Sequence, residues 1–180
     1  MIGLALLALA LADAGSSARP CVPVASDHLE PTPSAIEDHR SLRQALGVPM
    51  PQAPTMVMLY GKGGHLSTEE YSIVLIRAAD GTWQGTAVGR SQIAVQDAPY
   101  IPMKEKDWTL AKAAAKELEN AISRHCPFDR AAPSKASKSN PPPRGYISER
   151  VDVFTPNHAP ITFYASEDDG KIAQFIRPQD

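Results

Sequence analysis

The chain has 180 residues and a formal net charge of −2, with 18 basic and 20 acidic residues in near balance. The chain is therefore not one of the strongly basic proteins that bind nucleic acid or anionic membrane surfaces. The length fits a single domain, and no stretch reaches the roughly 20 apolar residues that a membrane span requires.

Residues 1–14 have the pattern of a cleavable signal peptide. An uncharged apolar run occupies residues 1–12, which is too short to cross a bilayer and suits the apolar core of a signal. Small residues lie at the −3 and −1 positions of two cleavage sites, before Asp13 and before Gly15. We therefore expect a soluble exported protein, periplasmic or extracellular. The alternative is a buried apolar helix.

The two cysteines, Cys21 and Cys126, are predicted to form a disulfide, as paired cysteines of exported chains commonly do. Closing so long a loop is worth roughly 4–5 kcal/mol in the chain-entropy model. The bond would attach an extended proline-rich arm, residues 15–33, to the domain. Two alternatives are lipid attachment at Cys21, which the preceding Arg-Pro pair disfavours, and a nucleophilic Cys126 activated by His125.

A helix is predicted to open the domain, which we place at residues 34–178. Ser34 and Glu37 have the spacing of a capping box, and Gly47 supplies the stop. His39 falls on the same side of this helix as the apolar residues, and no second metal-ligating residue partners it. We expect it to be a half-buried packing residue rather than a ligand.

A short buried strand is predicted at residues 55–60, followed by a glycine-rich segment at residues 61–65. This segment lacks the spacing of a Walker loop, so we interpret it as a loop between strands. The strongest local pattern is a hairpin from Glu70 to Arg90, in which Asp80-Gly81 between two strand-like runs marks a tight two-residue turn.

A two-residue turn assigns the side chains of the hairpin to two sides. One side is small and apolar: Val74, Ile76, Ala78, Trp83, Gly85, Ala87 and Gly89. The other carries the residues that we take as a candidate partner face: Tyr71, Ile73, Leu75 and Val88. A thin, alanine-rich helix at residues 110–124 is expected to pack on the small side. The candidate partner face would then be covered by the N-terminal helix or by another molecule.

A proline-, serine- and lysine-rich surface loop is predicted at residues 131–144. Three short strands follow, at residues 147–154, 161–165 and 172–176, and form a meander. The expected fold class is therefore α+β: a single domain with an N-terminal helix and a mostly antiparallel sheet made of a hairpin, a helix and a three-stranded meander.

The search for chemistry finds no catalytic residue, no cofactor motif and no metal-ligand spacing among the five histidines and two cysteines. Two classes of function remain. The first is a non-enzymatic extracytoplasmic module that binds a protein, a wall component or a small apolar ligand. The alternative is a hydrolase that uses scattered groups such as His65, Asp97 and His158. Convergence of these groups in one pocket would favour the hydrolase.

Overall fold

The computed structural model describes residues 33–124, 145–156, 160–165 and 171–178. The predicted signal peptide, both cysteines, His158 and the predicted loop at residues 131–144 lie outside the described residues, as does nearly all of the predicted arm. No helix among the described residues is long and apolar enough to span a bilayer.

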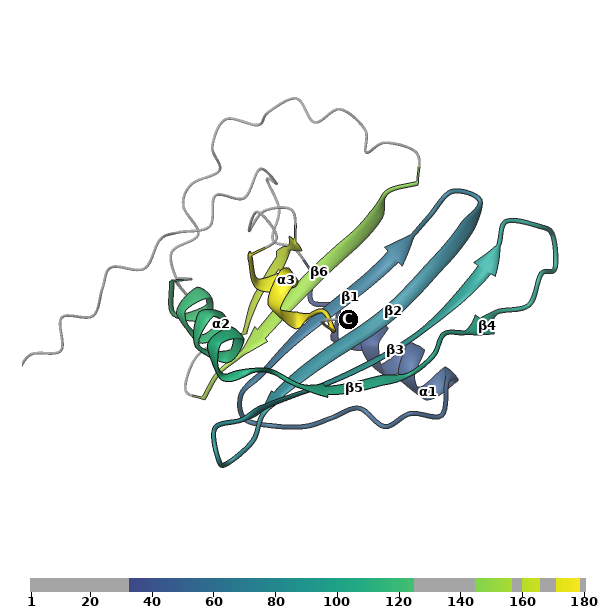
Figure 1. Cartoon of the computed structure of the whole chain (residues 1–180). Coiled ribbons are helices and arrows are strands. Elements are labelled where there is room, and N and C mark those ends of the chain that lie inside the picture. Colours follow the sequence, from purple (N-terminus) through teal and green to yellow (C-terminus); the bar gives the residue numbers. More distant parts are fainter. Residues whose placement is uncertain (1–32, 125–144, 157–159, 166–170, 179–180) are drawn as a thin grey trace, which may run out of the picture.

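Within the described residues the fold is α+β: a single domain with one seven-stranded antiparallel sheet and three helices (Figure 1). The order along the sheet is β4-β3-β2-β1-β6-β7, and β5 pairs with β3 beside β4. The strands are β1 (Met56–Gly63), β2 (Ser67–Arg77), β3 (Trp83–Ile93), β4 (Ile101–Pro102), β5 (Lys106–Thr109), β6 (Ile147–Phe154) and β7 (Ile161–Tyr164).

The helices cover both faces of the sheet. They are α1 (Ile36–Ala45), α2 (Lys112–Arg124) and α3 (Lys171–Ile176). Figure 1 shows α2 and α3 in front of the sheet and α1 behind it. The central strand β1 is buried on both faces, which explains why its sequence is a continuous apolar run without the alternation of a half-exposed strand.

The larger core lies on the α2/α3 face. Because side chains alternate along each strand, every second residue of β1, β2, β3 and β6 is directed to this face. The buried strand residues are Val57, Leu59, Ile73, Leu75, Trp83, Val151, Val153 and Phe163, and the helices contribute Leu118, Ile172, Ala173 and Ile176.

The opposite, α1 face has a smaller apolar cluster. Ala35 and Leu42 pack on Tyr60, with Leu46 at the margin. Helix α1 therefore covers one side of the sheet, but Tyr71, Ile73 and Leu75 of the candidate partner face lie on the other side, so the prediction that the N-terminal helix covers that face is wrong for them. The rest of this interface is polar, because His39 and Arg43 are buried next to Ser72 of β2.

The predicted register of the hairpin is wrong by one residue. Arg77 pairs with Trp83, and three residues, not two, form the loop between Ala78 and Thr82. Gly81 has a φ of +84°, as expected for the last position of a three-residue loop built on a type I turn. A shift of one residue moves every side chain of a strand to the other face. Ile73 and Leu75 therefore share a face with Ala87 and Gly85.

Helix α2 does not lie on the small residues of β3 as predicted. Trp108 of β5 covers Gly85 instead, since a Cβ added to Gly85 would lie 2.3 Å from Cε2 of its indole. Helix α2 reaches the hairpin near its turn, where Glu119 Oε1 accepts hydrogen bonds from Trp83 Nε1 at 3.2 Å and Arg77 Nε at 2.9 Å.

Three local predictions are corrected. The last predicted strand is helix α3, because Ile172 and Ile176 are buried one helical turn apart while Gln174 is exposed. Residues 61–63 belong to β1 and not to a loop. The capping box does not form: α1 has no side-chain cap at Ala35, whose N–H is bound by Asp152 of β6.

Candidate functional site

The four residues of the candidate partner face do not form an exposed surface. Tyr71, Ile73 and Leu75 are directed to the α2/α3 face, whereas Val88 pairs with Ser72 and lies on the α1 face. Leu75 is fully buried, and Ile73 and Val88 are 6% and 3% exposed. The domain covers this surface itself, so an extended partner-binding face made of these residues is not present.

Three of these residues, Tyr71, Ile73 and Val88, nevertheless belong to the lining of a pocket on the α2/α3 face, beyond the part that the helices cover. Its volume is about 320 Å³, within the range of small-ligand sites. We name it the β2–β3 pocket after the strands that form its floor. The lining consists of Glu69, Tyr71, Ile73, Ala87, Val88, Gly89, Met103, Lys104, Lys106, Arg177 and Pro178.

Tyr71 forms one side of the β2–β3 pocket. Its ring extends over β1 at Gly61, where an added Cβ would lie 2.2 Å from Cζ, so only glycine leaves room for this rotamer. Its hydroxyl donates a hydrogen bond to Glu149 on β6. Burial, with Glu149 beside it, raises the pKa of Tyr71 well above its usual range, so the ring stays neutral. The tyrosine is thus held across two neighbouring strands.

Three exposed cationic side chains belong to the lining of the β2–β3 pocket. Lys104, Lys106 and Arg177 belong to the lining, against one carboxylate, Glu69. Arg177 also forms an ion pair with Glu149, which reduces the positive charge that Arg177 adds to the pocket. Lys104 is exposed and forms no ion pair with any described residue. The pocket therefore combines an apolar floor with a net positive opening.

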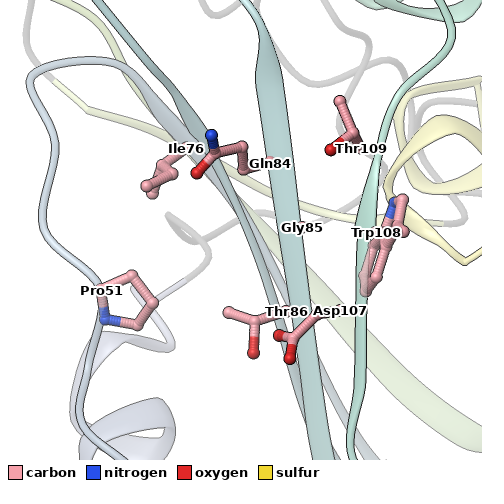
Figure 2. Close-up of a pocket in the computed structure, with 8 residues that line it drawn as sticks. All are labelled: Pro51, Ile76, Gln84, Gly85, Thr86, Asp107, Trp108 and Thr109. Atoms are coloured by element: carbon pink, nitrogen blue, oxygen red, sulfur yellow. The ribbon is translucent and has the colours of Figure 1, made fainter.

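A second pocket of about 390 Å³ lies at the junction of β3 and β5 (Figure 2). We call it the β3–β5 pocket. Figure 2 shows Thr86 and Asp107 next to each other across the two strands, as their pairing requires. The remaining lining is Pro51, Ile76, Gln84, Gly85, Trp108 and Thr109. Four of the eight lining residues carry a hydroxyl, amide or carboxylate group, and no cationic side chain lines the pocket.

A buried serine–histidine contact lies under α1. His39 Nδ1 is 2.7 Å from Ser72 Oγ, and Arg43 Nε donates to the same oxygen at 2.8 Å. Burial, followed by the charges of Arg43 and Arg150, lowers the pKa of His39 to about 3, so the ring is neutral near pH 7. Its Nε2 has no hydrogen-bond partner among the described residues. Sequence reasoning placed His39 on the packed side, and it is more deeply buried than expected.

This contact is not a nucleophile–base pair that a substrate could reach. Ser72 and His39 are both fully buried. Arg43 is also buried, and its guanidinium donates to the carbonyl oxygens of Ser72 and Thr86 at 3.3 and 3.2 Å. Burial lowers the pKa of Arg43 to about 10, which still leaves it charged at neutral pH. The network joins α1 to two strands, which is a structural role.

A second polar group lies nearby on the same face, centred on Glu70. Its carboxylate accepts hydrogen bonds from Tyr60 Oη at 2.5 Å and Arg90 Nε at 2.7 Å. Burial alone would raise the pKa of Glu70, but these bonds and the charges of Lys62 and Arg90 lower it below its usual value. The buried carboxylate is therefore ionised and fully paired, as buried charges must be.

Two of the three residues of the predicted hydrolase are described, and both lie in exposed connections between strands. His65 lies in the exposed turn between β1 and β2, and Asp97 in the exposed connection between β3 and β4. Neither lines the β2–β3 pocket or the β3–β5 pocket. His158 is outside the described residues. Among the described residues, no three or more His, Cys, Asp or Glu side chains form a group that could hold a metal ion.

Sequence reasoning missed the cationic side of the β2–β3 pocket and the role of Trp108. Lys104 and Lys106 follow no pattern that sets them apart from other surface lysines, and only the pairing of β5 with β3 brings them to the pocket.

Comparison with protein-family models, with curated proteins and with solved structures found no match to the chain. We therefore infer the function from the geometry of the pockets.

Proposed function

We propose that the protein is an exported, non-enzymatic binding module that takes up a small apolar ligand in the β2–β3 pocket. The observation that carries the proposal is the uncovered part of the α2/α3 face. There, Ile73 and Ala87 form an apolar floor between Tyr71 and Met103, and neither α2 nor α3 fills the space. An apolar concavity with a few polar groups at its opening is the usual form of a small-molecule site.

The export part of the proposal is supported by the sequence. Residues 1–14 have the length and composition of a signal peptide, and the chain has two cysteines that suit an oxidising compartment. All of these residues lie outside the described part of the structure. N-terminal sequencing of the protein recovered outside the cytoplasm should begin near residue 13 or 15, and material beginning at Met1 would contradict export.

The non-enzymatic part is supported by what lines the two pockets. Neither lining includes a histidine, serine or cysteine, so neither pairs a common nucleophile with a histidine base. The serine–histidine contact between Ser72 and His39 is buried under α1. We accordingly expect no hydrolysis of activated esters above the buffer rate.

A neutral fluorescent probe, N-phenyl-1-naphthylamine, tests the binding function independently of charge. We expect saturable fluorescence enhancement with the wild-type protein and its loss with Ala87→Leu, because the larger side chain would occupy the floor of the β2–β3 pocket. Ala113→Leu, at an exposed position of α2, is the matched control and should bind like the wild type. Equal binding by all three proteins would contradict the proposed site.

A further inference from the structure

We infer that the ligand of the β2–β3 pocket is a small amphipathic carboxylate, an apolar chain or ring that ends in a single anionic head group. The inference rests on the proposed function and extends it from an apolar site to a defined ligand class. It follows from the separation of two kinds of side chain in the same pocket, apolar at the floor and cationic at the opening.

The apolar part of the site is built from both strands and from the segment that follows β4. Ile73 is nearly buried and belongs to the main core, so it is a fixed surface and not a mobile side chain. Ala87 is small and leaves the space above it open, while Met103 is 41% exposed at the edge. Methionine adapts to ligands of irregular shape, which suits an aliphatic chain.

The charged part of the site comes from two segments that are distant in sequence. Lys104 follows Met103 in the connection between β4 and β5, and Arg177 follows the last residue of α3. Both line the same pocket, so a head group at the opening would lie between cations from two sides. Lys104 forms no ion pair with any described residue, whereas Arg177 already has Glu149 as a partner, so the head group would neutralise the ammonium of Lys104 first.

The volume sets the size of the ligand. A space of about 320 Å³ holds a chain of medium length or one to two fused rings, but not a folded peptide or an intact two-chain lipid. Glu69 in the lining disfavours a second negative charge on the ligand. One head group and one apolar body therefore match the site.

Three probes with the same alkyl chain and different head groups test the inference: decanoate, decanol and decyltrimethylammonium, each below its aggregation concentration at pH 7.5. Binding is followed by the amide chemical shifts of the labelled full protein in NMR titrations. We expect decanoate to shift the amides of Ala87, Gly89 and Lys104 and to bind about fivefold to tenfold more tightly than decanol. The cationic probe should bind most weakly.

Charge reversal locates the head group. Lys104→Glu should weaken decanoate binding by about tenfold and leave decanol binding within twofold. Lys112→Glu makes the same change at an exposed position of α2 that does not line the pocket, and it should leave both affinities unchanged. Both lysines are exposed, so neither variant is expected to disturb folding.

The outcomes separate the inference from the proposed function. If decanol and decanoate shift the same amides with equal affinity, the pocket is a ligand site but the carboxylate class is wrong. If Lys104→Glu and Lys112→Glu weaken decanoate equally, the attraction is a general charge effect and the head-group position is wrong. If none of the three probes shifts the pocket amides, both the ligand class and the proposed function are wrong.

Discussion

The carboxylate of Asp152 accepts the backbone N–H of Ala35 at 2.9 Å, across a sequence separation of 117 residues. Ala35 is the N-cap of α1 and has no side-chain cap of its own. The free N–H groups at a helix start need an acceptor, and here a buried strand residue provides it. The second oxygen of Asp152 accepts from Thr162 Oγ1 at 2.6 Å, which holds the carboxylate in place.

Replacing Asp152 with alanine should destabilise the fold by about 1–3 kcal/mol, because the amide of Ala35 would be left buried without its acceptor. Asp152→Asn keeps an oxygen acceptor in a side chain of the same size, so it should lower the free energy of unfolding by less than the alanine substitution does. Urea unfolding followed by circular dichroism measures both changes. An alanine variant as stable as the wild type would show that water replaces the carboxylate at the helix start.

His39 makes the stability of the domain depend on pH. Its pKa is about 3 in the folded state, against 6.5 for an unperturbed histidine, so the unfolded chain binds a proton in this interval and the folded chain does not. The free energy of unfolding should therefore be highest above pH 6.5. It should fall as the pH drops toward 3, by at most about 1.4 kcal/mol per pH unit.

Urea unfolding at pH 7, 6 and 5 measures this slope in a range where Glu70 does not yet titrate. Glu70, whose pKa is lowered, also contributes stability that is lost at acid pH, but only below its usual value of 4.5. His39→Asn keeps a polar atom near the position of Nδ1 and cannot titrate, so its profile should be flatter. Parallel profiles for the two proteins would contradict the assignment to His39.

Gly85 should tolerate no side chain. An added Cβ would lie 2.3 Å from Cε2 of the Trp108 indole, so the ring would have to move away from β3. We expect Gly85→Ala to cost about 1–3 kcal/mol of stability and to change the near-ultraviolet signal of Trp108. Gln84→Ala, at the exposed neighbouring position of β3, is the control and should change stability by less than about 0.5 kcal/mol. Equal effects of the two substitutions would contradict this packing.

The pairing of Cys21 with Cys126 remains a prediction. The denatured, non-reduced protein should contain no titratable thiol, and reduction should lower the free energy of unfolding by roughly 4–5 kcal/mol in the chain-entropy model. Two thiols per chain in the exported protein would show that the bond is absent. A single thiol would mean that one cysteine reacts elsewhere.

The hairpin shows how far the sequence predicts this fold. Asp80-Gly81 locates the turn correctly, but the same dipeptide suits both a two-residue loop and the three-residue loop that forms here. Both Leu75 and its neighbour Val74 are apolar and fully buried, on opposite faces of the sheet, so the residue types of the strand do not select the register. A local pattern could not decide it, and the error moved the candidate partner face to the wrong surface.

The pocket was partly predictable. Tyr71 and Ile73 were selected because they form an amphipathic side of a strand, and both line the β2–β3 pocket. The strand that carries Lys106 and Trp108 has four residues, three of them exposed, and no alternating apolar pattern. The only sequence signal for this strand was Gly85 of β3, since a glycine within a strand often marks the close approach of another group. Tertiary pairing alone brings these residues to the site.

The central strand β1 pairs with one strand that is close in sequence and with one that is distant. It pairs with β2 through a short turn, but its other neighbour is β6, where Met56 pairs with Phe154, about 100 residues further along the chain. During folding, one side of β1 is an open edge until β6 docks, with Val57 and Leu59 beside it. Unpaired apolar edges recruit strands from other chains. Refolding yield should therefore fall steeply with protein concentration, and the aggregates should grow from the unpaired side of β1.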